Sequence, residues 1–127
     1  KEVYEYGERA QDKGLFIVDS PGREPEVLTA LAAAGVNVII FTTGLGAPQG
    51  FPFVPVIKIT GNPNTYQRLT DHMDVFIEPT NKASYDIAQA GQALYQEVLA
   101  VASGKQTKAE VINYGSFPNI FTLGPVI

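Results

Sequence analysis

Two charged side chains interrupt apolar runs in this chain: Lys58 lies within residues 54–59, and Asp74 lies within residues 73–77. A charge in such a run must reach solvent, pair with an opposite charge or take part in chemistry. Because lysine is rarely fully buried, the simplest expectation for Lys58 is an edge strand from which its ammonium extends to water. A buried Lys58 would instead suit a general base or a clamp for substrate charge, and Asp74 on a neighbouring strand could be its partner.

Residues 42–50 are a second candidate site, because hydroxyl groups and glycines stand together there without helical or strand periodicity. The glycine spacing is GxGxxxG, and the apolar run 55–60 follows instead of a helix, so the segment is not a dinucleotide-binding fingerprint. It also lacks the Gly-Lys-Ser/Thr of a phosphate loop. Two interpretations remain open. Backbone amides near Gly44 and the hydroxyls of Thr42 and Thr43 hold a carboxylate or phosphate, or the segment is a turn-rich connection without a ligand.

The residue inventory limits the other chemistry that is available. The chain has no cysteine and one histidine, His72, so it cannot by itself build thiolate zinc sites, cysteine nucleophiles or two-histidine metal sites. The net charge is −4, without a cluster of lysine or arginine, which argues against nucleic acid as a partner. The apolar run 36–41 is far shorter than the ~20 residues that span a bilayer. We therefore expect no membrane span and a cytoplasmic setting.

Hydrophobic periodicity and turn residues predict alternating strands and helices. The expected strands are the apolar runs 15–18, 36–41, 55–60 and 73–77. The expected helices are 2–12, 25–34, a short one capped by Asn62 or Asn64, a long one from Ser84 to Gly104, and a last one opened by the capping-box pattern at Thr107. In the long helix, one apolar stripe is expected at Ile87, Gly91, Leu94, Val98 and Val101.

This order predicts one three-layer α/β domain, Rossmann-like or flavodoxin-like, with a mostly parallel sheet of about four strands. Ligands of such sheets bind beyond the carboxyl ends of the strands. The residues expected at that edge are Asp19 and Ser20, Thr42 to Gly44, Gly61 and Asn62, and Glu78 to Thr80.

An ordered set of motifs runs through nearly the whole chain: GLFIVDSPG at 14–22, FTTGLG at 41–46, PVIK at 55–58, Asn62, Met73-Asp74 and VASGKQTKAE at 101–110. In this order the motifs resemble the C-terminal domain of the altronate/galactarate dehydratase family. The resemblance implies that residues 1–127 are a single α/β domain in the C-terminal part of a longer lyase. It also implies dehydration of a sugar acid, with relatives that release sulfite from sulfolactate.

The resemblance further implies an elimination in which the α-proton is removed and the β-hydroxyl leaves, assisted by iron(II) or manganese(II). On this interpretation Lys58 and Asp74 are catalytic, and Asp19 assists a metal whose other ligands lie outside this chain. The substrate-binding residues are then Thr42, Thr43, Gly44, Gly46 and Asn62. If Lys58 is the general base, Lys58→Met lowers turnover by at least ~100-fold.

Three positions depart from the family pattern: Leu45 where arginine is usual, His72 where a second acid is usual, and residues 76–78 where Asn-Ala-Gly is usual. Loss of a loop arginine weakens carboxylate binding, so the substrate can differ from those of the relatives. The alternative is a non-catalytic ligand-binding or assembly domain, in which Lys58 and Asp74 are structural partners. The expected partners are a sugar-acid or other hydroxy-acid substrate, upstream domains or a partner subunit, and a second copy in a homodimer held by the tail 117–127.

Overall fold

The computed structural model describes residues 3–77, 86–115 and 119–121. Their elements are, in chain order, β1 (Val3–Tyr4), β2 (Ile17–Val18), α1 (Glu24–Ala33), β3 (Ile39–Thr42), β4 (Val56–Thr60), α2 (Pro63–Arg68), β5 (Val75–Phe76), α3 (Ile87–Ala102) and α4 (Lys108–Val111). The strand pairs described are all parallel: β1 pairs with β2, and a separate sheet has the order β3-β4-β5. The predicted α/β class with parallel strands is confirmed.

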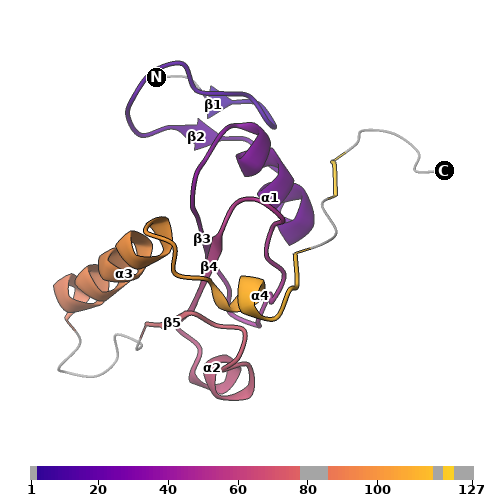
Figure 1. The fold of residues 1–127 in the computed structure, drawn as a ribbon. Coiled ribbons are helices and arrows are strands. Elements are labelled where there is room, and N and C mark those ends of the chain that lie inside the picture. Colours follow the sequence, from indigo (N-terminus) through magenta and orange to yellow (C-terminus); the bar gives the residue numbers. More distant parts are fainter. Residues whose placement is uncertain (1–2, 78–85, 116–118, 122–127) are drawn as a thin grey trace.

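The three-stranded sheet separates two hydrophobic clusters, because alternate residues of a strand point to opposite faces. Val56 of β4 belongs to the cluster that contains Leu28 of α1, whereas Ile57 and Ile59 pack with Val101 of α3. The helices α1 and α3 therefore lie on opposite sides of the sheet (Figure 1). Every residue of β4 is buried, since this central strand has strands on both edges and helices over both faces.

The N-terminal segment differs from the sequence prediction. A helix is expected over residues 2–12, but Val3–Tyr4 is strand β1, and a turn follows in which the Glu8 N–H donates to the Glu5 carbonyl. Gly7 has φ +74, a left-handed conformation that a regular helix does not contain. The helix prediction is wrong because the Tyr4 carbonyl pairs with a distant segment instead of with a helical N–H. It accepts from the Asp19 N–H at 2.8 Å.

The apolar run 15–18 forms a strand, as predicted, but β2 is neither buried nor part of the main sheet. Leu15 is 97% exposed and Ile17 is 67% exposed. The sheet of about four strands expected from the sequence is thus divided into a two-stranded and a three-stranded sheet. Asp19 and Ser20 consequently follow a strand of the smaller sheet and do not join the edge formed by β3, β4 and β5.

Capping residues set the helix ends close to where the sequence predicts them. Asn62 caps α2, with its side-chain oxygen accepting from the backbone N–H groups of Asn64 and Thr65. Thr107 and Glu110 form the predicted capping box of α4. The predicted start of the long helix at Ser84 lies outside the described residues, which begin again at Asp86, the N-cap of α3. None of the described helices is long and apolar enough to cross a membrane.

The apolar stripe predicted on α3 only partly faces the core. Leu94, Val98 and Val101 pack against the sheet. Ile87 is 73% exposed, and Gly91 is exposed as well. The spacing of 4, 3, 4 and 3 residues is right for one helix face, but the sheet is too short to cover the first turns of a sixteen-residue helix.

Candidate functional site

The carboxyl ends of β3 and β4 border an open cleft of about 520 Å³. Its lining residues are Thr42, Thr43, Gly44, Ile59, Thr60, Gly61, Asn62 and Ile77. This is the edge of a parallel sheet at which ligands bind. The structure therefore brings four of the five predicted substrate-binding residues together, and it leaves Gly46 outside the lining. Residues 78–80, which the sequence also places at this edge, lie outside the described residues.

Asn62 joins the two segments that form the wall of the cleft. Its Oδ1 accepts from the Asn64 N–H at 3.0 Å, and its Nδ2 donates to the Gly44 carbonyl at 2.8 Å. The hydroxyl of Thr65 donates to the same carbonyl at 2.7 Å. Both ends of the Asn62 amide are thus used within the protein, and a ligand could be met only by the second Nδ2 hydrogen.

Thr42 and Thr43 differ in how their hydroxyl groups can bind a ligand. The Oγ1 atom of Thr43 accepts from the Gly46 N–H at 3.0 Å, which closes a turn and leaves the hydroxyl proton of Thr43 to donate elsewhere. Thr42 is exposed at the end of β3. Hydroxyl donors beside glycine backbone can bind the oxygens of a hydroxy acid, which agrees with the first of the two interpretations of residues 42–50.

The fold itself requires a glycine at position 46. Its φ is +97, and a Cβ at this position would lie 2.2 Å from the Leu69 Cδ1 atom and 3.5 Å from the Thr65 Cγ2 atom. Gly46 thus permits both the left-handed turn and the close approach of the loop to α2. Gly44 in the same loop has open space within 4 Å of the Cβ position.

These two glycines predict opposite outcomes for the same substitution. Gly46→Ala is expected to lower the free energy of unfolding by about 1–3 kcal/mol, because it combines an unfavourable φ with a contact against Leu69. Gly44→Ala is the matched control, and it is expected to leave stability unchanged or to raise it by up to about 1 kcal/mol. Urea unfolding followed by circular dichroism measures both. Equal stability of the two variants would contradict the structural role of Gly46.

Lys58 lies at the centre of the sheet rather than at an edge. Its side chain is 0% exposed, its Nζ pairs with the carboxylate of Glu24 in the first turn of α1, and it stands 4.3 Å from the ring centroid of Phe41. Burial lowers the pKa of Lys58 from 10.5 to about 7, although the negative charge of Asp74 opposes the shift. The expected edge-strand lysine is therefore wrong, because β5 covers the edge of β4 that β3 leaves open.

Asp74 connects three segments through backbone contacts. Its Oδ2 accepts from the Lys58 N–H at 2.7 Å, and its Oδ1 accepts from the Lys108 N–H at 2.8 Å. The Asp74 N–H in turn donates to the Lys58 carbonyl at 2.9 Å. Lys58 and Asp74 are therefore neighbours, as the sequence suggests, but the contacts of the Asp74 carboxylate are to main chain, and the ammonium of Lys58 meets Glu24.

The other predicted site residues, Lys58, Asp74 and Asp19, do not line the cleft. Lys58 and Asp74 are absent from its lining, although Thr60, two residues beyond Lys58 on the same side of β4, belongs to it. Asp19 is exposed after β2 in the other sheet. Across the described ranges, no three histidine, cysteine or acidic side chains are grouped so that they could hold a metal ion. The described residues therefore form no complete metal centre by themselves. The prediction that Asp19 assists a metal with ligands from outside this chain stays a prediction, as do the roles of Lys58 and Asp74.

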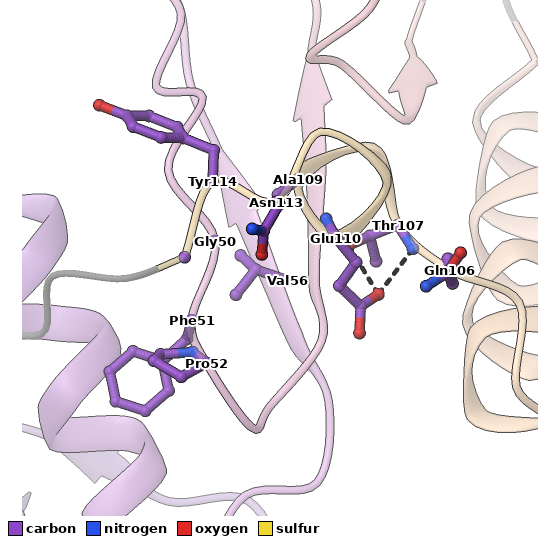
Figure 2. A pocket seen from close by; sticks show the side chains of 11 residues that line it. Gly50, Phe51, Pro52, Val56, Gln106, Thr107, Ala109, Glu110, Asn113 and Tyr114 are labelled. Carbon is purple, nitrogen blue, oxygen red and sulfur yellow. Dashed lines mark hydrogen bonds between the residues drawn. The ribbon is translucent and has the colours of Figure 1, made fainter.

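A second pocket, of about 300 Å³, lies near the beginning of β4, at the opposite end of that strand from the cleft (Figure 2). Between its walls, the Gly50 N–H donates to the Tyr114 carbonyl at 2.7 Å. The Glu110 carboxylate on its border accepts from the backbone N–H and the hydroxyl of Thr107. None of the residues predicted to act in binding or catalysis lines this pocket, and its acid is committed to the helix cap.

Comparison with known proteins finds the same family that the sequence motifs resemble. Residues 1–124 match the family model described as D-galactarate/altronate dehydratase, C-terminal. The β subunit of (2R)-sulfolactate sulfo-lyase from Chromohalobacter salexigens is 32% identical over 91% of this chain and 30% of the relative. Galactarate dehydratase (L-threo-forming) from Escherichia coli is 34% identical over 83% of this chain and 20% of the relative. Altronate dehydratase from Bacillus subtilis is 42% identical over 52% of this chain and 13% of the relative.

The matches cover most of this chain but only a small part of each relative. The family model covers nearly all of this chain, whereas the chain spans less than a third of the length of the curated relatives it matches. The matched residues include the loop after β3, the central strand β4 and the segment that leads into α4. The chain belongs to the D-galactarate/altronate dehydratase family and matches its C-terminal region.

Proposed function

We propose that this chain is the C-terminal domain of a hydro-lyase that removes water from a sugar acid, and that its cleft holds part of the substrate. The observation that carries the proposal is the cleft at the carboxyl ends of β3 and β4, where the hydroxyls of Thr42 and Thr43 lie beside the backbone of Gly44 and the amide of Asn62. A polyhydroxy acid offers oxygens that such donors can bind. Family membership and the dehydratase names of two relatives support the reaction class.

The proposed reaction begins with removal of the proton on the carbon next to the carboxylate, which leaves an enediolate. The hydroxyl on the next carbon then leaves and takes up a proton, so that water and an enol are released, and the enol rearranges to a 2-oxo acid. A divalent metal such as the iron(II) or manganese(II) implied by the family resemblance would stabilise an enediolate. Because the described residues gather no such ligand set, the task we assign to them is to bind and orient the substrate.

Of the roles expected for Lys58, the geometry supports a structural one better than the general base or the clamp for substrate charge. A pKa of about 7 suits a base, but the ammonium is buried against Glu24 and Phe41 and does not line the cleft. Through its position in β4, Lys58 fixes the strand from which Thr60 and the following residues enter the cleft. If Lys58 has this structural role, Lys58→Met should cost less turnover than the ~100-fold expected of a base.

A second candidate activity is the release of sulfite from a sulfolactate-like acid. The sulfo-lyase subunit matches a larger share of this chain, 91%, than the Bacillus subtilis altronate dehydratase does, 52%. Leu45, next to Gly44, is 90% exposed where the family resemblance leads us to expect arginine. A substrate held without that arginine need not be a long-chain sugar acid.

Turnover with a panel of acids tests the proposal. The complete enzyme that contains this domain is incubated with altronate, galactarate and (2R)-sulfolactate, and the 2-oxo acid and sulfite are measured separately. We expect a 2-oxo acid without sulfite from one of the two sugar acids. Sulfite release from sulfolactate alone would establish the second candidate instead. Turnover of none of the three acids, by an enzyme shown to be folded and supplied with iron(II) or manganese(II), would contradict both.

A further inference from the structure

The hydroxyl of Thr65 forms its hydrogen bond outside its own helix. In α1, by comparison, the hydroxyl of Thr29 donates to the Pro25 carbonyl at 2.8 Å, four residues earlier, which is the usual local bond of a helical threonine. Thr65, in the first turn of α2, donates to the Gly44 carbonyl at 2.7 Å, 21 residues away in the sequence. The Thr65 hydroxyl therefore supports the loop after β3 and not the helix that carries it.

Both groups on the Cβ atom of Thr65 face this loop. The hydroxyl bonds to Gly44, and the methyl group lies 3.5 Å from the position that a Cβ at Gly46 would occupy. Because threonine is restricted about χ1, the two contacts fix its side chain in one orientation. Thr65 is also buried, with 7% of the residue exposed. Valine would keep the shape without the donor, and serine would keep the donor without the methyl group.

Side-chain packing does not hold the peptide that joins Gly44 to Leu45. Gly44 has open space around its Cβ position, and the Leu45 side chain is 90% exposed. Glycine backbone adopts many conformations, so hydrogen bonds must set the direction of this peptide. The Asn62 amide supplies a second bond to the Gly44 carbonyl, but that bond is exposed to water, whereas the bond from Thr65 is partly buried. Water competes less for the buried bond, so Thr65 is the stronger of the two restraints.

The direction of the Gly44 carbonyl decides what the loop can offer to a substrate. The bonds from Thr65 and Asn62 use both acceptor sites of its oxygen. In a planar trans peptide the N–H points opposite to the C=O, so the Leu45 N–H points away from α2. The N–H groups of Gly44 and Leu45 form no hydrogen bond with another of the described residues. The loop thus keeps backbone donors available for the oxygens of a hydroxy acid.

We propose that Thr65 is a positioning residue of the cleft, and that its hydroxyl holds the Gly44 carbonyl against α2 and so keeps the loop after β3 in the conformation that binds substrate. Thr65 itself is not part of the cleft lining, so it acts through Gly44 and does not touch the substrate. This inference rests on the proposed function, because it requires that the acid binds in the cleft.

The kinetics of Thr65→Val in the complete enzyme test this role, with whichever of altronate, galactarate and (2R)-sulfolactate the enzyme turns over. We expect KM to rise about fivefold or more and kcat to change less than about twofold, because a displaced loop weakens the binding of substrate and transition state alike. Thr65→Ser keeps the donor and should hold KM within about twofold of the parent value. Thr29→Val is the matched control, since it removes a hydroxyl bond of α1 outside the cleft lining and should leave KM unchanged.

A loss of stability alone would not separate the two Thr65 variants. Thr65→Val loses the hydrogen bond and Thr65→Ser loses the packed methyl group, so both are expected to unfold at a lower urea concentration than the parent. An equal rise of KM in both variants, or no rise in Thr65→Val, overturns the proposal.

The Gly44→Ala variant distinguishes a failure of this inference from a failure of the proposed function. If Gly44→Ala raises KM and Thr65→Val does not, the cleft binds substrate without the help of Thr65, and only the inference is overturned. If neither variant changes KM, or if the folded enzyme turns over none of the three acids, both proposals are overturned.

Discussion

Replacing Asp74 by alanine is expected to lower the free energy of unfolding by about 2–4 kcal/mol. The carboxylate accepts from the backbone N–H groups of Lys58 at 2.7 Å and of Lys108 at 2.8 Å, and alanine leaves both donors without that acceptor. One of these donors belongs to the buried central strand, where an unpaired N–H is costly. Urea unfolding at neutral pH measures the loss.

Asp71→Ala provides the control for the loss of a carboxylate as such. Asp71 is exposed three residues before Asp74, and its replacement is expected to change stability by less than about 0.5 kcal/mol. An Asp74→Ala variant as stable as the Asp71→Ala variant would show that Asp74 does not hold β4 and α4 together.

Lys58 is expected to make stability rise with pH above neutrality. Its pKa is about 7 in the folded protein against an ordinary value of 10.5, so between these values the unfolded chain binds one proton more than the folded chain does. The free energy of unfolding therefore increases with pH in this window, by up to about 1.4 kcal/mol per pH unit and by about 2 kcal/mol between pH 7 and 9. Well below pH 7, Lys58 is protonated in both states and contributes no slope.

The contribution of Lys58 is isolated by subtraction. Unfolding free energies of the parent chain and of Lys58→Met are measured at several pH values, and the difference between the two curves should grow with pH in favour of the parent. Parallel curves for the parent and Lys58→Met would contradict a buried lysine with a lowered pKa.

The parts of the fold that the sequence predicts well are those with a local cause. Asn62 caps α2 through the next few residues, and Thr107 and Glu110 form a capping box across one helical turn. The strand-like run around β4 is apolar on both faces because helices cover both. The run 15–18 shows the same apolar pattern, yet β2 is exposed, because composition does not say which strand will be its neighbour.

In the candidate site, too, the sequence predicts some features and not others. That the carboxyl ends of parallel strands meet at one edge is a general rule, and it places Thr42, Gly44 and Asn62 together. The partner of Lys58 could not be predicted, since Glu24 is 34 residues away in the sequence. By itself, Glu24 indicates only an acidic residue that stabilises the first turn of a helix. The backbone contacts of Asp74 likewise leave no pattern in the sequence.

Binding of substrate in the cleft is tested most directly by the KM of Gly44→Ala in the complete enzyme. The substitution fits the fold, because nothing lies within 4 Å of the new methyl group, but it extends into the space that the substrate would occupy. With whichever acid the enzyme turns over, KM is expected to rise about tenfold or more while stability is unchanged, whereas Thr70→Val, outside the cleft, leaves KM as it is. An unchanged KM and kcat in the Gly44→Ala enzyme would show that the substrate does not bind in this cleft.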